Sequence, residues 1–124
     1  MTALRQTRTA LTPKAAPFAI RAERASDVVA REALLDACFG ENRHLRTCQR
    51  LRDGRAPAEG LAFSAMADGR LVGTLRLWHV SAGGIPALML GPLAVDSLSR
   101  KLGVGTALMA HALAAAKSRG HRAV

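Results

Sequence analysis

The stretch from Leu93 to Ala107 constrains the fold of this chain more than any other. It follows an apolar run, Ala87 to Val95, whose composition is typical of a strand, and it leads into an Ala-rich amphipathic run, Thr106 to Arg119, that predicts a helix. Gly103 and Gly105 lie between the two runs. Glycine has no Cβ, so a backbone built from it can approach a ligand closely. The first N–H groups of a helix have no intrahelical partner and, with the helix dipole, form a site for an anion. The stretch therefore predicts a strand-to-helix turn that binds an anion, most simply a phosphate.

The residues beside the two glycines support this interpretation. Arg100 and Lys101 bring positive charge next to the turn, and the apolar run precedes the glycines at the distance expected for a strand. A Gly-x-Gly pair before a helix is nevertheless a weak signal on its own. An ordinary tight turn that needs glycine for its backbone angles fits the same residues.

This turn resembles a known motif. Arg100-Lys101-Leu102-Gly103-Val104-Gly105-Thr106-Ala107-Leu108 is similar to the Gln/Arg-x-x-Gly-x-Gly/Ala motif of the GNAT superfamily of acetyl-CoA-dependent N-acetyltransferases. The wider sequence resembles the bacterial branch often called YhbS-like. That resemblance runs from Gly60-Leu61-Ala62-Phe63 through Leu90-Gly91-Pro92-Leu93-Ala94-Val95 to Gly120-His121-Arg122-Ala123-Val124, and more loosely from Phe18. Many members carry Gly and Arg where this chain has Lys101 and Leu102, and a lysine there would either crowd a phosphate or contact it.

The resemblance implies acetyl-CoA as co-substrate. It implies that backbone groups of Leu93, Ala94 and Val95 pair with the pantetheine arm, and that the Val95 N–H is the oxyanion donor. The pyrophosphate is then held at the glycine turn, by Arg100, Lys101, Leu102, Gly103, Val104, Gly105, Thr106 and Ala107.

The sequence supplies few groups for proton transfer. Acetyl transfer to an amine needs a held thioester, a deprotonated amine and a preorganised oxyanion donor. No Glu follows Glu59, which leaves Asp96 and His79 as candidate catalytic residues. Asp96 also fits a turn or cap carboxylate, and His79 also fits a packed strand residue. The chain has no Tyr, so it cannot supply the tyrosine that many members use as general acid.

Composition limits the classes of function. With 124 residues the chain forms one domain at most. Its net charge of +9 favours anionic partners. Aromatic residues make up only 3%, however, which leaves few rings on which nucleic-acid bases can stack. Cys38 and Cys48 lack metal-ligand spacing and are expected to be reduced thiols, with a catalytic thiol at Cys48, which has Arg neighbours, as the alternative. No apolar stretch is long enough to cross a membrane. We therefore expect a cytoplasmic protein without metal, membrane or nucleic-acid binding. The resemblance implies a small-molecule or peptide amine as substrate, and a homodimer is left open.

The predicted order of elements is β-α-α-β-β-β-α, an α/β (α+β) fold with a mixed, mostly antiparallel sheet flanked by helices. Asp68-Gly69 predicts a hairpin turn, and Pro92 predicts a bulge or a change of pairing. Alternation places Leu71, Gly73, Leu75, Leu77 and His79 on one face of a strand and Val72, Thr74, Arg76, Trp78 and Val80 on the other. The remaining elements are a strand over 18–22, a helix from Ser26-Asp27 to Phe39-Gly40, a second helix over 43–52, a strand over 61–67 and a helix over 106–119 capped by Gly120.

The apolar faces of the helices follow from the same periodicity. In the first helix they are Val28, Val29, Ala33, Leu34 or Leu35, Ala37 and Cys38; in the second, Leu45, Cys48 and Leu51, with Arg on the other side; in the last, Leu108, Met109, Ala112, Leu113 and Ala116. Residues 1–17 are expected to be a disordered basic tail, and 18–124 the N-terminal and central part of an N-acetyltransferase domain. Compared with the resembled family, the C-terminal strands are absent. This predicts either a truncated domain or an edge that a partner chain supplies.

Three functions are compatible with these features. The first is an N-acetyltransferase that moves an acetyl group from acetyl-CoA to a primary amine. The second is a non-catalytic acyl-CoA-binding or degenerate fragment that acts by association. The third, a basic nucleic-acid-binding module, is disfavoured by the glycine turn and the scarcity of aromatic residues.

Overall fold

The computed structural model describes residues 18–45 and 54–124. The predicted basic tail at 1–17, Cys48, Leu51 and most of the predicted helix over 43–52 lie outside the described residues.

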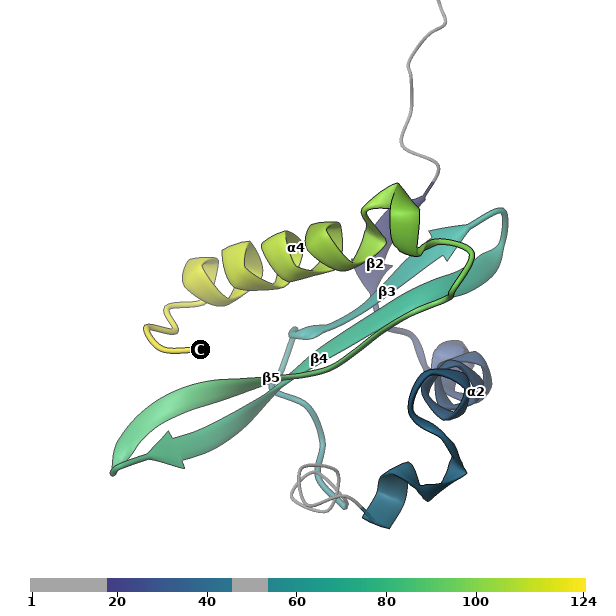
Figure 1. Ribbon diagram of the computed structural model, residues 1–124. Helices are drawn as coiled ribbons and strands as arrows, with labels where there is room; N and C mark the ends of the chain where they lie inside the picture. Colours follow the sequence, from purple (N-terminus) through teal and green to yellow (C-terminus); the bar gives the residue numbers. More distant parts are fainter. Residues whose placement is uncertain (1–17, 46–53) are drawn as a thin grey trace, which may run out of the picture.

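Four antiparallel strands form one sheet in the order β2-β3-β4-β5 (Figure 1). They are β2 (Ala19–Ala22), β3 (Ala62–Ala67), β4 (Arg70–Ala82) and β5 (Ile85–Val95). The helices are α2 (Val28–Phe39) and α4 (Val104–Ser118), with short 3-10 turns η1 (Ala25–Asp27), η2 (Glu41–Leu45) and η3 (Arg100–Leu102). The predicted fold class is confirmed, although the second predicted helix contributes only η2 to the described residues.

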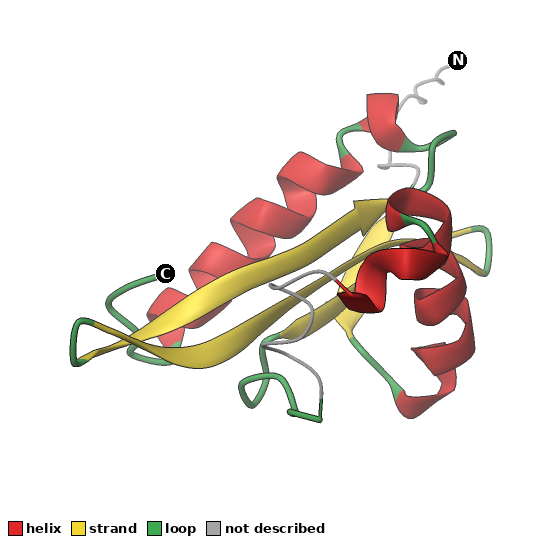
Figure 2. Ribbon diagram, turned by 60° about the horizontal axis from the view of Figure 1, so that its bottom comes forward, coloured by secondary structure: helices red, strands yellow, loops and turns green. Residues whose placement is uncertain are grey.

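The two helices cover opposite faces of the sheet, as the two views show (Figures 1 and 2). The larger core lies under α4, where its largest fully buried side chains are Leu61, Val72, Leu75, Leu77, Val104 and Leu108. A smaller core lies under α2 and is formed by Leu34, Leu35 and Ala94. The end of β5 is therefore enclosed between both layers.

The buried faces of the helices differ in part from the periodicity prediction. In α2, Val28 and Val29 are 43% and 82% exposed, whereas Arg31 is buried. The reason is an ion pair between Arg31 and Glu23, which draws the charged side chain inward and turns the first apolar pair toward solvent. In α4, Leu113 is exposed because the inner face is the narrow row Val104, Leu108, Ala112 and Ala116.

A bulge in β4 corrects the predicted alternation. Ala65 pairs with Gly73 and Met66 pairs with Leu71, so Val72 is an extra residue opposite β3. An extra residue interrupts the strict alternation of a strand, so the side chains at and before the bulge lie on the opposite face from the one that alternation predicts. The prediction is correct for Gly73, Leu75 and Leu77, but it is wrong for Val72, which joins the core under α4, and for Leu71, which packs under α2.

Hairpin turns and the final cap agree with the sequence. Asp68 and Gly69 have φ of 51° and 75°, the left-handed pair that the Asp-Gly turn predicts. Gly120 ends α4 with φ 86°, and the His121 N–H donates to the Ala116 carbonyl. Beyond it, Ala123 accepts a hydrogen bond from the Leu88 N–H on the outer edge of β5.

The first residues of the predicted second helix differ from the prediction of a basic surface helix. Arg43, expected on the solvent side, is buried, and Leu45, expected on the inner side, is exposed. Arg43 turns inward because it pairs with Glu32 and Asp36 of α2. No helix among the described residues has the length and apolar character needed to span a bilayer.

Candidate functional site

A second bulge, in β5, changes which backbone groups face the outer edge of the sheet. Leu77 pairs with Leu90 and Leu75 pairs with Leu93, so β5 carries one extra residue at Gly91-Pro92. The change of pairing predicted from Pro92 is confirmed. The Trp78 indole N–H donates to the Gly91 carbonyl and so ties the bulge to the neighbouring strand.

The direction of the backbone groups beyond the bulge follows from the pairing register. The Asp96 N–H donates to the Val72 carbonyl of β4, so Asp96 faces inward. In an antiparallel ladder alternate residues face the partner strand. The N–H and C=O groups of Leu93 and Val95 therefore face the outer edge, where no strand of the described residues pairs with them.

The outward-facing Val95 carbonyl is contacted by two side chains. It accepts hydrogen bonds from the Cys38 thiol, at 3.5 Å, and from Arg100 Nε, at 3.2 Å. Arg100 Nη2 lies 3.7 Å from Cys38 Sγ. Arg100 thus reaches back from the turn to the edge of β5, and Cys38, on α2, lies beside the same edge.

The glycine turn leads directly from this edge into α4. Gly103 has φ 80°, a left-handed conformation that glycine adopts without strain, and a Cβ at this residue would meet nothing within 4 Å. The helix begins at Val104, two residues before the predicted start. Its first paired backbone N–H is that of Ala107, which donates to the Gly103 carbonyl at 3.0 Å. The N–H groups of Val104, Gly105 and Thr106 precede it and have no carbonyl partner within the helix.

Two further glycines bring α4 close to the sheet. A Cβ on Gly105 would lie 3.6 Å from Val95 Cγ2, an ordinary contact. A Cβ on Gly73 would lie only 2.8 Å from Val104 Cγ1 and 2.9 Å from Leu108 Cδ1. The first turn of α4 therefore packs directly against β4 because Gly73 has no side chain. Gly73 was not part of the sequence motif.

The structure separates the two candidate proton-transfer residues. Asp96 directly follows β5, and its Oδ2 is buried without a hydrogen-bond partner among the described residues. His79 lies six residues after Gly73, the partner of Val95, roughly 20 Å along β4. Its ring packs at 5.6 Å from that of His121. Only Asp96 shares the end of the sheet with the glycine turn.

A cavity of about 150 Å³ lies on the α2 face, next to the β5 bulge. Its lining includes Arg31, Arg43, Thr74, Arg76, Trp78 and Pro92. The alternation of Thr74, Arg76 and Trp78 placed these side chains on one face, but no sequence pattern indicated that Arg31 of α2 and Arg43 of η2 would join them there. Sequence reasoning therefore missed this cavity.

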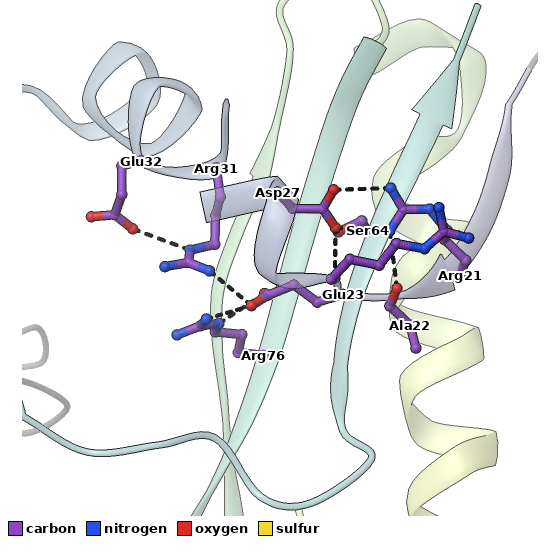
Figure 3. A network of polar contacts seen from close by, with 9 residues as sticks. Arg21, Ala22, Glu23, Asp27, Arg31, Glu32, Ser64 and Arg76 are labelled. Atoms are coloured by element: carbon purple, nitrogen blue, oxygen red, sulfur yellow. Dashed lines mark hydrogen bonds and ion pairs between the residues drawn. The ribbon is translucent and has the colours of Figure 1, made fainter. Parts of the chain in front are cut away.

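Ion pairs hold the cavity wall and the start of α2 (Figure 3). Glu23 accepts from Arg31 Nη1 at 2.8 Å and from Arg76 Nε at 2.9 Å. Burial raises the pKa of the Glu32 carboxyl, but hydrogen bonds from Arg43 and Arg31 outweigh it and hold that pKa below its ordinary value.

The Asp27 carboxylate accepts four hydrogen bonds in this network. It accepts from Arg21 at 2.7 and 2.9 Å, from the Arg24 N–H at 2.8 Å and from Ser64 Oγ at 2.8 Å. The Arg21 hydrogen bonds hold the pKa of Asp27 well below its usual range, assisted by Arg24 and Ser64 and opposed by burial. In the part of the chain that the structure describes, no three His, Cys, Asp or Glu side chains gather as a metal site would require.

Comparisons with known proteins agree on one family. The pattern of the acetyltransferase (GNAT) family matches residues 28–124. The chain is similar to a GNAT family acetyltransferase from Brucella melitensis, solved in complex with acetyl-CoA, at 24% identity and a TM-score of 0.71, over 87% of this chain and 73% of that one. It is also similar to the GNAT family N-acetyltransferase YhbS from Escherichia coli, solved with CoA, at 25% identity and a TM-score of 0.74, over 90% of this chain and 63% of that one. No curated protein matched the sequence.

Proposed function

Because this chain belongs to the acetyltransferase (GNAT) family, we propose that it transfers an acetyl group from acetyl-CoA to a primary amine. One observation carries the proposal: a single turn, residues 96–103, joins the outward-facing edge of Leu93 and Val95 to the N–H groups at the start of α4 that have no partner within the helix. The edge offers hydrogen bonds to an extended amide-bearing chain, and the helix start offers them to an anion. Acetyl-CoA has both parts in this order.

The turn suits the pyrophosphate for three reasons. The N–H groups of Val104, Gly105 and Thr106 have no partner in the helix, and the helix dipole adds a partial positive charge there. The space beside Gly103 is open. Lys101 is exposed next to these amides, so it can contact the phosphate without crossing the turn.

The edge of β5 suits the acyl end. The Val95 and Leu93 N–H groups point out of the sheet beyond the bulge, and a fixed backbone N–H is a preorganised donor for a developing oxyanion. Cys38 and Arg100 contact the Val95 carbonyl, so both side chains must shift for a pantetheine amide to pair there. Asp96, with its buried and unpartnered Oδ2, is our candidate for accepting the amine proton, directly or through water.

Binding and chemistry are tested separately. Titration with acetyl-CoA and with desulfo-acetyl-CoA at two salt concentrations measures cofactor affinity, with DNA as the competing ligand. We expect binding of both CoA compounds and no salt-steep DNA binding. Amide NMR then locates the site: the Val95, Gly103 and Thr106 signals should shift with acetyl-CoA, and that of His79 should not. Unmoved signals at the glycine turn would refute the proposal.

A non-catalytic acyl-CoA-binding protein is the second candidate. It is favoured by the lack of any Tyr in the chain and by the separation of His79 from Val95. It predicts CoA binding without thiol release over a panel of amines. Release of CoA in proportion to acetylated amine selects the transferase instead.

A further inference from the structure

We infer that the amine acceptor carries an oxyanion group, a carboxylate or a phosphate, which binds in the cavity between α2 and the β5 bulge. The inference rests on the proposed function and adds to it the chemical class of the acceptor. The side chain of Thr74 lines the cavity, and Thr74 is 1% exposed. Its Oγ1 has no hydrogen-bond partner among the described residues.

An unpaired buried hydroxyl is unusual, because most buried polar groups find a partner. The neighbouring strand gives a direct comparison. Ser64 of β3 is the register partner of Thr74 and is equally buried, yet its hydroxyl donates to Asp27 at 2.8 Å. The two hydroxyls therefore differ in role: that of Ser64 supports the fold, whereas that of Thr74 remains available to a molecule in the cavity.

The guanidinium groups around Thr74 select for negative charge. Arg31, Arg43 and Arg76 each use Nε and one terminal nitrogen on carboxylates. The other terminal nitrogen of each has no partner within the described part of the chain. A guanidinium can thus keep its structural ion pair and still donate to a second oxyanion.

The balance of charge at the cavity surface points the same way. The three arginines line the cavity. Of the carboxylates that pair with them, Glu32 also lines it, whereas Glu23 and Asp36 are not part of the lining. A bare ammonium compound would meet mainly cations. An oxyanion at this place meets fixed positive charge and the Thr74 hydroxyl, and it leaves the amine at the other end of the molecule free to approach the bulge.

Pro92 and Trp78 place this cavity beside the proposed acyl end. Pro92 is part of the β5 bulge and also lines the cavity. Trp78 connects the bulge and the cavity. Its indole N–H donates to the Gly91 carbonyl of the bulge, and its ring, which lines the cavity, lies 5.7 Å from the Arg76 guanidinium. A short acceptor bound through its oxyanion therefore presents its amine next to the edge where the Leu93 and Val95 N–H groups begin.

The test uses two matched pairs of acceptors in an assay of thiol release from acetyl-CoA. β-Alanine is compared with n-propylamine for the carboxylate, and O-phosphoethanolamine with ethanolamine for the phosphate. We expect at least one oxyanion-bearing amine to have a kcat/KM about tenfold or more above that of its partner, the size of one hydrogen bond to a charged group. The two pairs decide between carboxylate and phosphate.

Two variants separate recognition from stability. Thr74→Val keeps the shape and removes only the unpaired hydroxyl, so the melting temperature should hold or rise, while KM for the preferred acceptor rises about tenfold. Ser64→Ala is the control: it should lower the melting temperature and leave the preference between paired amines unchanged. Equal use of both members of each pair, or an unchanged KM in Thr74→Val, overturns the inference even if acetyl-CoA binds.

The proposed function fails if acetyl-CoA does not bind, and this result is separate from a failure of the oxyanion site. If acetyl-CoA does not bind, calorimetry with β-alanine and O-phosphoethanolamine alone still tests the cavity. Binding that Thr74→Val weakens supports an oxyanion site, and no binding of either compound overturns it.

Discussion

Replacing Gly73 by alanine should loosen the start of α4 and weaken cofactor binding. The new Cβ would lie 2.8 Å from Val104 Cγ1 and 2.9 Å from Leu108 Cδ1, and both distances are too short for carbon atoms. Val104 is the first residue of the helix, so relieving the contact means moving the turn that offers its N–H groups. The 3.3 Å approach to Ala65 on β3 blocks a retreat in that direction.

The magnitude follows from two opposing effects. Overpacking a core costs about 1–3 kcal/mol, and replacing glycine in a strand offsets about 0.5–1 kcal/mol of this. The expected net loss is about 1–2 kcal/mol in the free energy of unfolding, or roughly 4–8 °C in melting temperature for a domain of this size. CoA affinity should fall about fivefold or more, the equivalent of about 1 kcal/mol.

Gly105→Ala is the matched control, because the same methyl group would lie 3.6 Å from Val95 Cγ2. Removing a glycine from a helix stabilises by up to about 1 kcal/mol, so the melting temperature should hold or rise by a few degrees. Calorimetric unfolding of both variants, with CoA titrations alongside, checks the pair. If Gly73→Ala is as stable as the parent and binds CoA equally well, α4 is not seated on β4 as described.

Three other predictions use different measurements. Arg21 is the chief cause that holds the pKa of the Asp27 carboxyl below the usual range. The contribution of Asp27 to stability should therefore be complete above the ordinary aspartate pKa of about 4 and be lost as the pH falls below it. Denaturant unfolding between pH 3 and 7 should show the free energy of unfolding falling at the acid end, and Asp27→Asn should reduce that fall. In a Cys48→Ser background, alkylation of the Cys38 thiol should slow when CoA is added, since the thiol contacts the edge proposed for the pantetheine arm; an unchanged rate would place the arm elsewhere. Gly103→Ala forces a side chain into a left-handed conformation, at about 1–2 kcal/mol, and should lower both melting temperature and CoA affinity, whereas retention of both would show that the turn tolerates a Cβ.

Much of the fold could be predicted because local rules act within short segments. The Asp68-Gly69 turn, the cap at Gly120 and the bulge at Pro92 each depend on backbone preferences of one or two residues. The predictions that were wrong involved competition between distant groups. Val28 and Val29 satisfy helical periodicity, but Arg31 turns inward because Glu23, on another segment, can pair with it.

The candidate site divides in the same way. The glycine turn, the preceding strand and Asp96 are contiguous in the sequence, so a motif could point to them. The cavity could not be found by that route, because Thr74 and Arg76 come from a strand, Arg31 from a helix and Arg43 from the segment after it.

The sequence by itself determined the order of the elements and the glycine turn between β5 and α4, since these depend on side-chain periodicity and on the backbone freedom of individual residues. Tertiary structure decided which edge amides of β5 face outward, which arginines are buried, and which of the two paired hydroxyls, Ser64 or Thr74, is left without a partner. Those outcomes depend on bulges and on packing between layers, which place groups from distant segments within hydrogen-bond distance, and no local pattern carries that information.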